Sequence, residues 1–445
     1  MHSSISVYRT VRDGSQRLTA DAAIPFHPDT EGVENRVVNV YGDLTGQTLI
    51  GFGAAFTEAA AVTWQKLSAE SREAVLKAYF DPKDGHGYTF CRTHMNSCDF
   101  SVGNYACDDM PGDVDLLHFS LARELEAMIP MMKAAGSHGR FQLFVSPWSP
   151  PAWMKDTQRM NQGGRLLPEF HHAWALYYAK FIKALRAEGL DIWGLTVQNE
   201  PKATQTWDSC VYTAEEERDF VRDHLGPVLE AEGLSDVRIL IWDHNKERLY
   251  ERAKVAFSDP AASKYIWGAG FHWYSGDHFE AVDAVRRRWP DKGLVFTEGC
   301  TCLRQGDAAW TNAEQYGHDL VGNLNAGMQA WAEWNIVLDE IGGPNHVANY
   351  CEAPVIIDTK TGGVEYKPSW FYIGHFSRFL PPGSVQVCTT RFGDAVETTA
   401  FRRPDGTYAL VAMNRQDEAG DFVLRFEDQV AEIPLPAHSI ATLVW

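Results

Sequence analysis

Positive charge is scarce in this chain: 40 Lys and Arg residues stand against 59 Asp and Glu residues, and the formal net charge is −19 at pH 7. Nucleic acids and anionic membranes are bound by basic surfaces, so this balance argues against either as the main partner. No apolar run is long enough to span a bilayer, so we expect no integral membrane association. The first residues lack a basic stretch followed by an apolar one, so we expect a cytoplasmic protein, or a secreted one if a signal was removed.

Cysteine is also sparse, with eight residues in 445. That density is far below that of a disulfide scaffold, so we expect reduced thiols. Cys300 and Cys302 have a single residue between them and no second pair or histidine cluster beside them, so we predict no metal site. The Ser146-Pro-Trp-Ser149 segment lacks the glycines of a serine-hydrolase elbow, and no glycine-rich phosphate loop is present, so we expect no organic cofactor.

Short apolar runs alternate with helical patterns through the middle of the chain. Apolar residues recur at helical spacing between the runs, for example from Leu121 to Met132 and from Phe170 to Leu185, and Thr213 and Glu216 have the spacing of a capping box. The runs cover residues 49–53, 89–95, 141–146, 192–197, 237–242, 268–273, 294–297 and 328–334. Eight such strand and helix units predict an α/β fold, the (β/α)8 TIM barrel.

Both ends of the chain have a different pattern. The first 45 residues resemble strands separated by turns and have no helical period, and from about residue 385 strand-like segments flank an Arg-Arg-Pro-Asp-Gly turn signal. We therefore predict a side β-sandwich domain formed from both termini, residues 1–45 and 375–445. The catalytic barrel would then span residues 46–374.

Two glutamates stand at the ends of predicted barrel strands. Glu200 follows the fourth run in Gln198-Asn-Glu-Pro201, and Glu298 ends the seventh run in Thr297-Glu-Gly-Cys300. A single such residue is more often a structural acid held by an arginine, but two at barrel strand ends are the equipment of a glycoside hydrolase. The fourth and seventh strands face each other across the barrel mouth, so we expect the carboxyl groups about 5–5.5 Å apart, which is the retaining separation.

The residues near these glutamates fit the same chemistry. Asn199 can bond a sugar hydroxyl, and Tyr274, after His272 at the end of the sixth run, could donate a hydrogen bond to the nucleophile or simply pack in the core. Arg92 in the second run could keep a nucleophile ionised or could form a structural ion pair with Asp99. The sequence leaves both pairs of alternatives open.

Three tryptophans lie at strand ends or in the loops that follow. Trp148, Trp207 and Trp334 could each offer a ring face to a pyranose, although a single tryptophan is more often part of a core. Trp334 is the strongest candidate because it closes the eighth run.

These motifs together resemble glycoside hydrolase family 30, which includes glucosylceramidases. The resemblance rests on Gly51-Phe-Gly-Ala-Ala-Phe56, Met95-Asn-Ser-Cys-Asp-Phe-Ser101, Ser146-Pro-Trp-Ser149, Gln198-Asn-Glu-Pro201, His272-Trp-Tyr274, Thr297-Glu-Gly-Cys300 and Gly342-Gly-Pro-Asn345. It implies net retention, with Glu200 as acid/base and Glu298 as nucleophile. It also implies a sugar-binding shell of Arg92, Asp99, Trp148, Asn199, Tyr274, Trp334 and Asn349, to which we add Trp207 and His272 as substrate-binding candidates.

The resemblance implies a β-glucosidase similar to glucosylceramidases, with sphingolipid metabolism as the expected context and a small β-linked carbohydrate as the expected partner. Gln198, residues 202–208 and His346 depart from the glucosylceramidase pattern where an aglycone would sit, which argues against glucosylceramide itself. A β-1,6-glucanase, a β-xylosidase and a β-fucosidase of the same family are the alternatives within enzymes. A non-catalytic carbohydrate-binding protein is disfavoured because both glutamates are retained.

Overall fold

The computed structural model describes residues 4–445. The chain divides into two compact units. One comprises the chain up to Gly51, Arg304–Gln329 and Tyr366–Trp445, and the other comprises Phe52–Leu303 and Ala330–Glu365. The predicted barrel domain, residues 46–374, included the segments 304–329 and 366–374 that this division groups with the terminal strands.

Eight parallel strands form a closed barrel, and each of the eight apolar runs supplies one of them. The predicted (β/α)8 fold is therefore confirmed. The strands are almost wholly buried, which explains why their sequences are continuous apolar runs rather than alternating ones. They are β6 (Gly51–Phe56), β7 (Phe90–Met95), β8 (Gln142–Pro147), β9 (Ile192–Thr196), β10 (Arg238–Asn245), β11 (Ile266–His272), β12 (Gly293–Glu298) and β13 (Ala330–Glu333).

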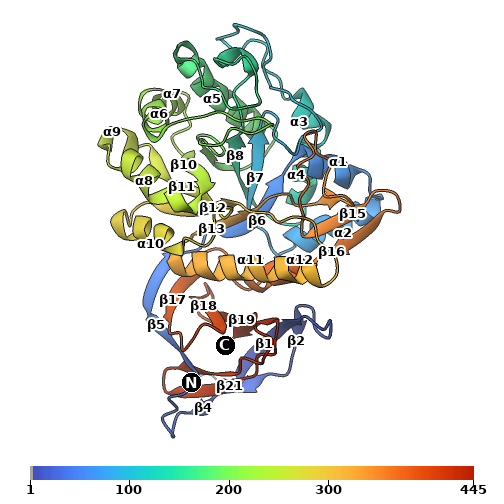
Figure 1. The fold of residues 1–445 in the computed structure, drawn as a ribbon, viewed down its shortest axis with the longest axis vertical. Helices are drawn as coiled ribbons and strands as arrows, with labels where there is room; N and C mark the ends of the chain where they lie inside the picture. Colours follow the sequence, from blue (N-terminus) through green and yellow to red (C-terminus); the bar gives the residue numbers. More distant parts are fainter. Residues whose placement is uncertain (1–3) are drawn as a thin grey trace. The chain divides into compact units, whose positions relative to one another are not determined.

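Helices lie outside the ring of strands (Figure 1). They are α1 (Glu58–Gln65), α2 (Ala69–Phe80), α3 (Ala122–Glu126), α4 (Met128–Gly136), α5 (His171–Ala187), α6 (Ala214–Phe220), α7 (Gly226–Ala231), α8 (Leu249–Phe257), α9 (Pro260–Ser263) and α10 (Phe279–Arg288). The Thr213 capping box is present. The helical pattern from Leu121 to Met132 is interrupted at Ala127, because Pro130 has no backbone N–H to continue a helix and fits only in the first turn of a new one.

The other unit is built on one 11-stranded sheet with strands from both chain ends. β1 (Ser4–Val11) pairs with β22 (Ser439–Val444), and β5 (Val37–Thr48) pairs with β17 (Val385–Thr389) and β20 (Phe422–Phe426). Side chains from all of these strands meet in a single apolar core, as in a sandwich. The unit also holds α11 (Asp307–Ala326), α12 (Pro368–Ser377), β18 (Val396–Arg402), β19 (Tyr408–Asn414) and β21 (Gln429–Ile433).

Five of the eight cysteines are buried: Cys91, Cys98, Cys107, Cys210 and Cys351. Within residues 4–445, no helix combines the length and the apolar character needed to traverse a bilayer.

Candidate active site

The two glutamates meet at the carboxyl ends of their strands. Glu298 is the last residue of β12, and Glu200 lies four residues after the end of β9. An oxygen of Glu200, an oxygen of Glu298 and a ring nitrogen of His272 all lie within 4.8 Å of one another. This limit applies to one oxygen of each carboxylate, and such a close approach leaves less room for a water between them than the roughly 6.5–9.5 Å of inverting enzymes does.

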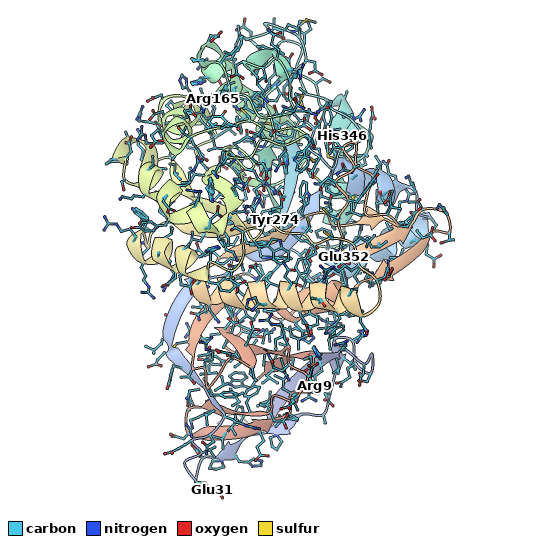
Figure 2. All side chains as sticks on the ribbon, viewed as in Figure 1. Arg9, Glu31, Arg165, Tyr274, His346 and Glu352 are labelled. Atoms are coloured by element: carbon cyan, nitrogen blue, oxygen red, sulfur yellow. The ribbon has the colours of Figure 1, made fainter. Side chains whose placement is uncertain are left out.

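Glu298 is held firmly by two donors. Arg92 Nη1 donates to its Oε2 at 2.6 Å, and the hydroxyl of Tyr274, labelled in Figure 2, donates to its Oε1 at 2.9 Å. Tyr274 therefore takes the hydrogen-bonding alternative rather than packing alone. Burial raises the pKa of Glu298, while His272 and Arg92 oppose that increase by favouring the charged form.

Arg92 is fully buried and joins several parts of the site. Besides Glu298, its guanidinium donates to Asp243 at 2.8 Å, to Asn199 Oδ1 at 2.9 Å and to Ser146 Oγ at 3.0 Å. A buried guanidinium needs acceptors for its N–H groups, and here each acceptor comes from a different strand end. The alternative ion pair with Asp99 is not formed.

Asp99 pairs instead with another predicted residue. Its Oδ2 accepts a hydrogen bond from Asn349 Nδ2 at 2.9 Å, while its Oδ1 is buried without a protein partner. Burial raises the pKa of Asp99 well above its usual range, and the nearby charges of Glu298 and Glu200 add to the increase.

Glu200 has looser contacts than Glu298. Its carboxylate lies 3.3 Å from His272 Nδ1, 3.4 Å from Gln205 Nε2 and 3.8 Å from His244 Nε2. Burial alone would raise the pKa of Glu200, but the hydrogen bond from His272 and the charge of His244 lower it below the ordinary value. The carboxylate is thus accessible to proton exchange, in contrast to the firmly anchored Glu298.

His272 lies between the acidic groups. Its Nε2 is 2.9 Å from Asp243 Oδ1, and its side chain has no exposed surface. Burial lowers its pKa, but Glu298, Asp243 and Glu200 together raise it to about 9. The ring is therefore protonated at neutral pH and donates from both nitrogens. Its hydrogen bonds are with these carboxylates, and substrate binding by His272 stays a prediction.

The three predicted tryptophans share one apolar cluster with Phe100 and Cys351. Trp148 and Trp334 stack with ring centroids 5.0 Å apart, and the Arg92 guanidinium lies over both rings, 4.7 Å and 5.5 Å from their centroids. Trp207 is partly buried against the same cluster. The rings are thus both part of a core and adjacent to the charged site.

Comparisons with known proteins agree with this arrangement. Residues 49–380 match the Glycosyl hydrolase family 30 TIM-barrel domain, and residues 383–443 match the family's beta sandwich domain. The chain belongs to glycosyl hydrolase family 30.

Relatives in family 30 cover nearly the whole chain. The lysosomal acid glucosylceramidase of Mus musculus is 34% identical over 468 residues, which is 99% of this chain and 89% of that protein. The crystal structure of SrfJ from Salmonella typhimurium has a TM-score of 0.96 and 35% identity, covering 99% of both chains. The endo-beta1,6-glucanase BT3312 has a TM-score of 0.89 and 28% identity, again covering 99% of both chains.

The family 30 site contains a carboxylate that sequence reasoning missed. Asp243 is fully buried in β10, where its Oδ2 also accepts from Thr196 Oγ1 at 2.6 Å and its backbone oxygen accepts from Glu200 N at 2.9 Å. The Arg92 guanidinium and other donors keep the pKa of Asp243 far below its usual range, although burial acts to raise it. Asp243 directly follows the fifth apolar run, so the signal that identified Glu200 and Glu298 was present there too.

The cluster of Glu200, His272 and Glu298 has the donor types of a metal site. However, Arg92 Nη1 lies 2.6 Å from Glu298, and His272 carries a proton at neutral pH. A bound cation would therefore be repelled by both groups and would have to displace the His272 proton. This charge arrangement favours proton transfer and disfavours metal binding.

Proposed function

We propose that this family 30 hydrolase is a retaining β-glucosidase in which Glu298 is the nucleophile and Glu200 the acid/base. The observation that carries this assignment is the pair of closely spaced carboxylates with different partners. Glu298 is fixed by Arg92 and Tyr274, whereas Glu200 contacts groups that can exchange a proton with it. A nucleophile must be held at one angle, and an acid/base must change its protonation during each turnover.

In the first step, Glu298 attacks the anomeric carbon as the bond to the leaving oxygen breaks and Glu200 transfers its proton to that oxygen. The glycosyl–enzyme ester has no charge on Glu298. In the second step, Glu200 takes a proton from water, the water oxygen attacks the anomeric carbon, and Glu298 leaves as a carboxylate. The sugar is released with its β configuration.

The proton that Glu200 needs can come from His272. In the free site Glu200 is ionised, and Nδ1 of the protonated His272 ring lies 3.3 Å from its carboxylate oxygen Oε1. A bound sugar would displace water from Glu200 and so favour its neutral form. We therefore assign His272 as the group that supplies this proton, with Asp243 on the opposite ring nitrogen stabilising the charged ring.

The remaining polar groups suit a neutral sugar. The free Oδ1 of Asp99 can accept a hydrogen bond from a sugar hydroxyl. Arg92 donates to the side-chain oxygen of Asn199, which leaves the amide nitrogen of Asn199 to donate to a sugar. The Trp148 and Trp334 pair supplies an apolar wall beside them. This combination supports glycone binding by the predicted shell.

The substrate we propose is a β-glucoside. The mouse lysosomal acid glucosylceramidase supports a sphingolipid-type glucoside, although the departures at Gln198 and His346 disfavour glucosylceramide itself. A β-1,6-linked glucan is the second candidate, and the endo-beta1,6-glucanase BT3312 supports it. A panel of aryl β-glucosides, glucosylceramide in detergent and β-1,6-linked glucose oligomers would rank the two by kcat/KM. Greater activity on aryl β-xylosides or β-fucosides than on aryl β-glucosides would exclude both.

The catalytic assignment is tested by trapping the intermediate. A 2-deoxy-2-fluoro-β-glucoside with a good leaving group should attach one glycosyl group to Glu298, located by mass spectrometry of the digested protein. Glu298→Gln should abolish labelling. The control is Glu124→Gln, which alters another buried glutamate, one that accepts a hydrogen bond from Cys107, and it should leave labelling intact. Attachment to any other residue would refute the assignment.

A further inference from the structure

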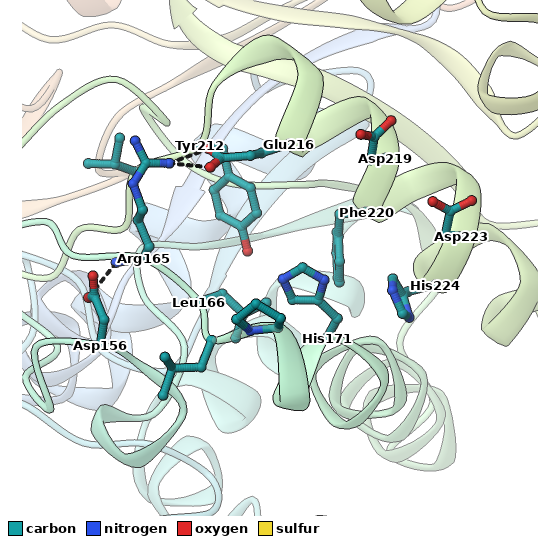
Figure 3. Close-up of a pocket in the computed structure, with 13 residues that line it drawn as sticks. Asp156, Arg165, Leu166, His171, Tyr212, Glu216, Asp219, Phe220, Asp223 and His224 are labelled. Atoms are coloured by element: carbon teal, nitrogen blue, oxygen red, sulfur yellow. Dashed lines mark hydrogen bonds and ion pairs between the residues drawn. The ribbon is translucent and has the colours of Figure 1, made fainter.

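A second pocket lies in the barrel unit among residues that the catalytic site does not use. It occupies about 460 Å³ and is lined by the segment that precedes α5, by the start of α5, and by α6 with the π-helical turn Val221–Leu225 (Figure 3). Cavities of a few hundred Å³ are the size that holds small ligands. The π-helical geometry is itself rare and is often found at functional sites.

The hydroxyl of Tyr212 has no hydrogen-bond partner and is directed into this pocket (Figure 3). The residue is only 4% exposed, and its backbone is fixed because its N–H donates to Pro201 O at 2.8 Å and its carbonyl accepts from Arg252 at 3.0 Å. A buried hydroxyl without a partner is unfavourable. A ligand in the pocket can supply the missing bond.

Aromatic rings form the wall beside this hydroxyl. Phe220 lies 6.2 Å from Tyr212 and 6.2 Å from His224 between ring centroids, and the His171 ring is 5.1 Å from that of His224. Burial lowers the pKa of both histidines, so the rings are neutral at pH 7. His171 is perpendicular to Phe220 and His224, with interplanar angles of 80°, whereas Phe220 and His224 are close to parallel at 25°. The wall is therefore uncharged but angular, and an aromatic face such as that of Phe220 suits the C–H face of a ring-shaped ligand.

Three of the four carboxylates that line the pocket are ion-paired with arginines. Arg165 pairs with Glu216, and Arg222 pairs with both Asp219 at 2.8 Å and Asp223 at 2.6 Å. The fourth, Asp156, accepts the uncharged backbone N–H of Arg165 at 2.7 Å. The pocket therefore keeps some negative charge, and its carboxylate oxygens retain lone pairs for further donors.

These features together select a ligand class. Negatively charged, acceptor-rich walls disfavour an anion and favour a ligand that carries several hydrogen-bond donors, and the rings favour an apolar face. We propose that this pocket is a second binding site for a neutral pyranose sugar, separate from the catalytic site. Its hydroxyls would donate to the carboxylates and bond to Tyr212 Oη, and its ring would lie against Phe220.

The test uses the full-length protein and glucose, a sugar that the enzyme cannot hydrolyse. Binding is followed by ligand-observed NMR titration and by crystals soaked in glucose. Val211→Trp, at a half-buried lining position, should fill the pocket and abolish one binding event, while Tyr212→Phe should weaken it roughly 3- to 10-fold through the loss of one neutral hydrogen bond. Trp334→Ala should leave this event unchanged while weakening any binding at the catalytic site.

Tyr88→Phe is the matched control, since it removes another buried hydroxyl without a partner but lies outside the pocket, and it should not change binding. The proposal is overturned if all glucose binding is lost in Trp334→Ala, or if Val211→Trp binds glucose as the wild type does. It is also overturned if tetramethylammonium occupies the pocket more tightly than glucose, which would show a site for organic cations.

Discussion

Replacing Arg92 with methionine tests the charge arrangement of the site most directly. The guanidinium contacts Glu298 and Asp243, and all three side chains are buried. Methionine keeps an unbranched apolar stem but has no charge, so the variant leaves two buried carboxylates without this cation. Removing one partner of a buried ion pair typically costs about 3–5 kcal/mol.

Although Arg92 pairs with two carboxylates, the expected loss of stability is about that of one broken ion pair, not two. Asp243 keeps the protonated His272 at 2.9 Å, and Glu298 keeps the Tyr274 hydroxyl at 2.9 Å. We therefore expect Arg92→Met to destabilise the barrel unit by about 3–5 kcal/mol in total. We also expect kcat to fall by about 10²–10³, because the group that orients the nucleophile is lost.

Urea unfolding followed by tryptophan fluorescence measures the first effect, and turnover of an aryl β-glucoside measures the second. Arg92→Met combined with Asp243→Asn removes one uncompensated charge, so it should recover about 1–2 kcal/mol of stability without recovering activity. Arg92→Lys should be intermediate, because an ammonium group cannot reach the four acceptors that the guanidinium serves. Loss of less than about 1 kcal/mol in Arg92→Met would refute the proposed role of Arg92 as the shared counterion.

Three further predictions concern other residues of the site. Glu200→Ala should slow glycosides with poor leaving groups far more than aryl glycosides, and azide should restore turnover as a β-glycosyl azide; equal losses without rescue would exclude the acid/base role. The pKa of His272 is raised to about 9, so the protonated ring stabilises the folded state by up to about 3 kcal/mol. This stabilisation is complete below pH 6.5 and is lost as the pH rises to 9. In His272→Gln, the free energy of unfolding should no longer fall between pH 6.5 and 9, and kcat should no longer fall at alkaline pH. Profiles of stability and kcat against pH that match the wild type would contradict this role of His272. Tyr274→Phe, which removes the 2.9 Å bond to Glu298, should lower kcat by about 10-fold with little change in unfolding midpoint.

The sequence predicted the features that have a period or a position along a strand. The eight barrel strands were recognised because a strand buried on both faces needs a continuous apolar run, and Glu200 and Glu298 because a charged residue interrupts that run at its end. Partners were harder to predict, because a run of residues does not specify which groups meet across the barrel. Arg92 could therefore have paired with Asp99 on sequence grounds, and only the folded structure decides for Asp243 and Glu298.

The position of Asp243 after an apolar run was visible in the sequence, but the direction of its side chain was not, for a reason that lies in the backbone. In the pairing of β10 with β11, Trp242 is opposite Gly270 and His244 is opposite Phe271, so Asp243 is an extra, bulged residue. Trp242 and Asp243 have φ values of +74° and +48°, and Glu200 has +48°, all in the left-handed region that non-glycine residues rarely adopt. Alternation along the strand does not predict where a bulged side chain points.

The bulge also explains how the site holds this unfavourable backbone. Each left-handed non-glycine residue costs about 1–3 kcal/mol, so the conformation persists only if contacts compensate for it. Asp243 provides them from both ends of the residue: its carboxylate accepts from Arg92, Thr196 and His272, and its carbonyl accepts from Glu200 N at 2.9 Å. The same hydrogen bonds that stabilise the bulge also place Glu200, the acid/base candidate, beside His272 and place Asp243 beside Arg92. The backbone strain at Glu200 and Asp243 therefore cannot be relieved without displacing the groups proposed to carry out catalysis.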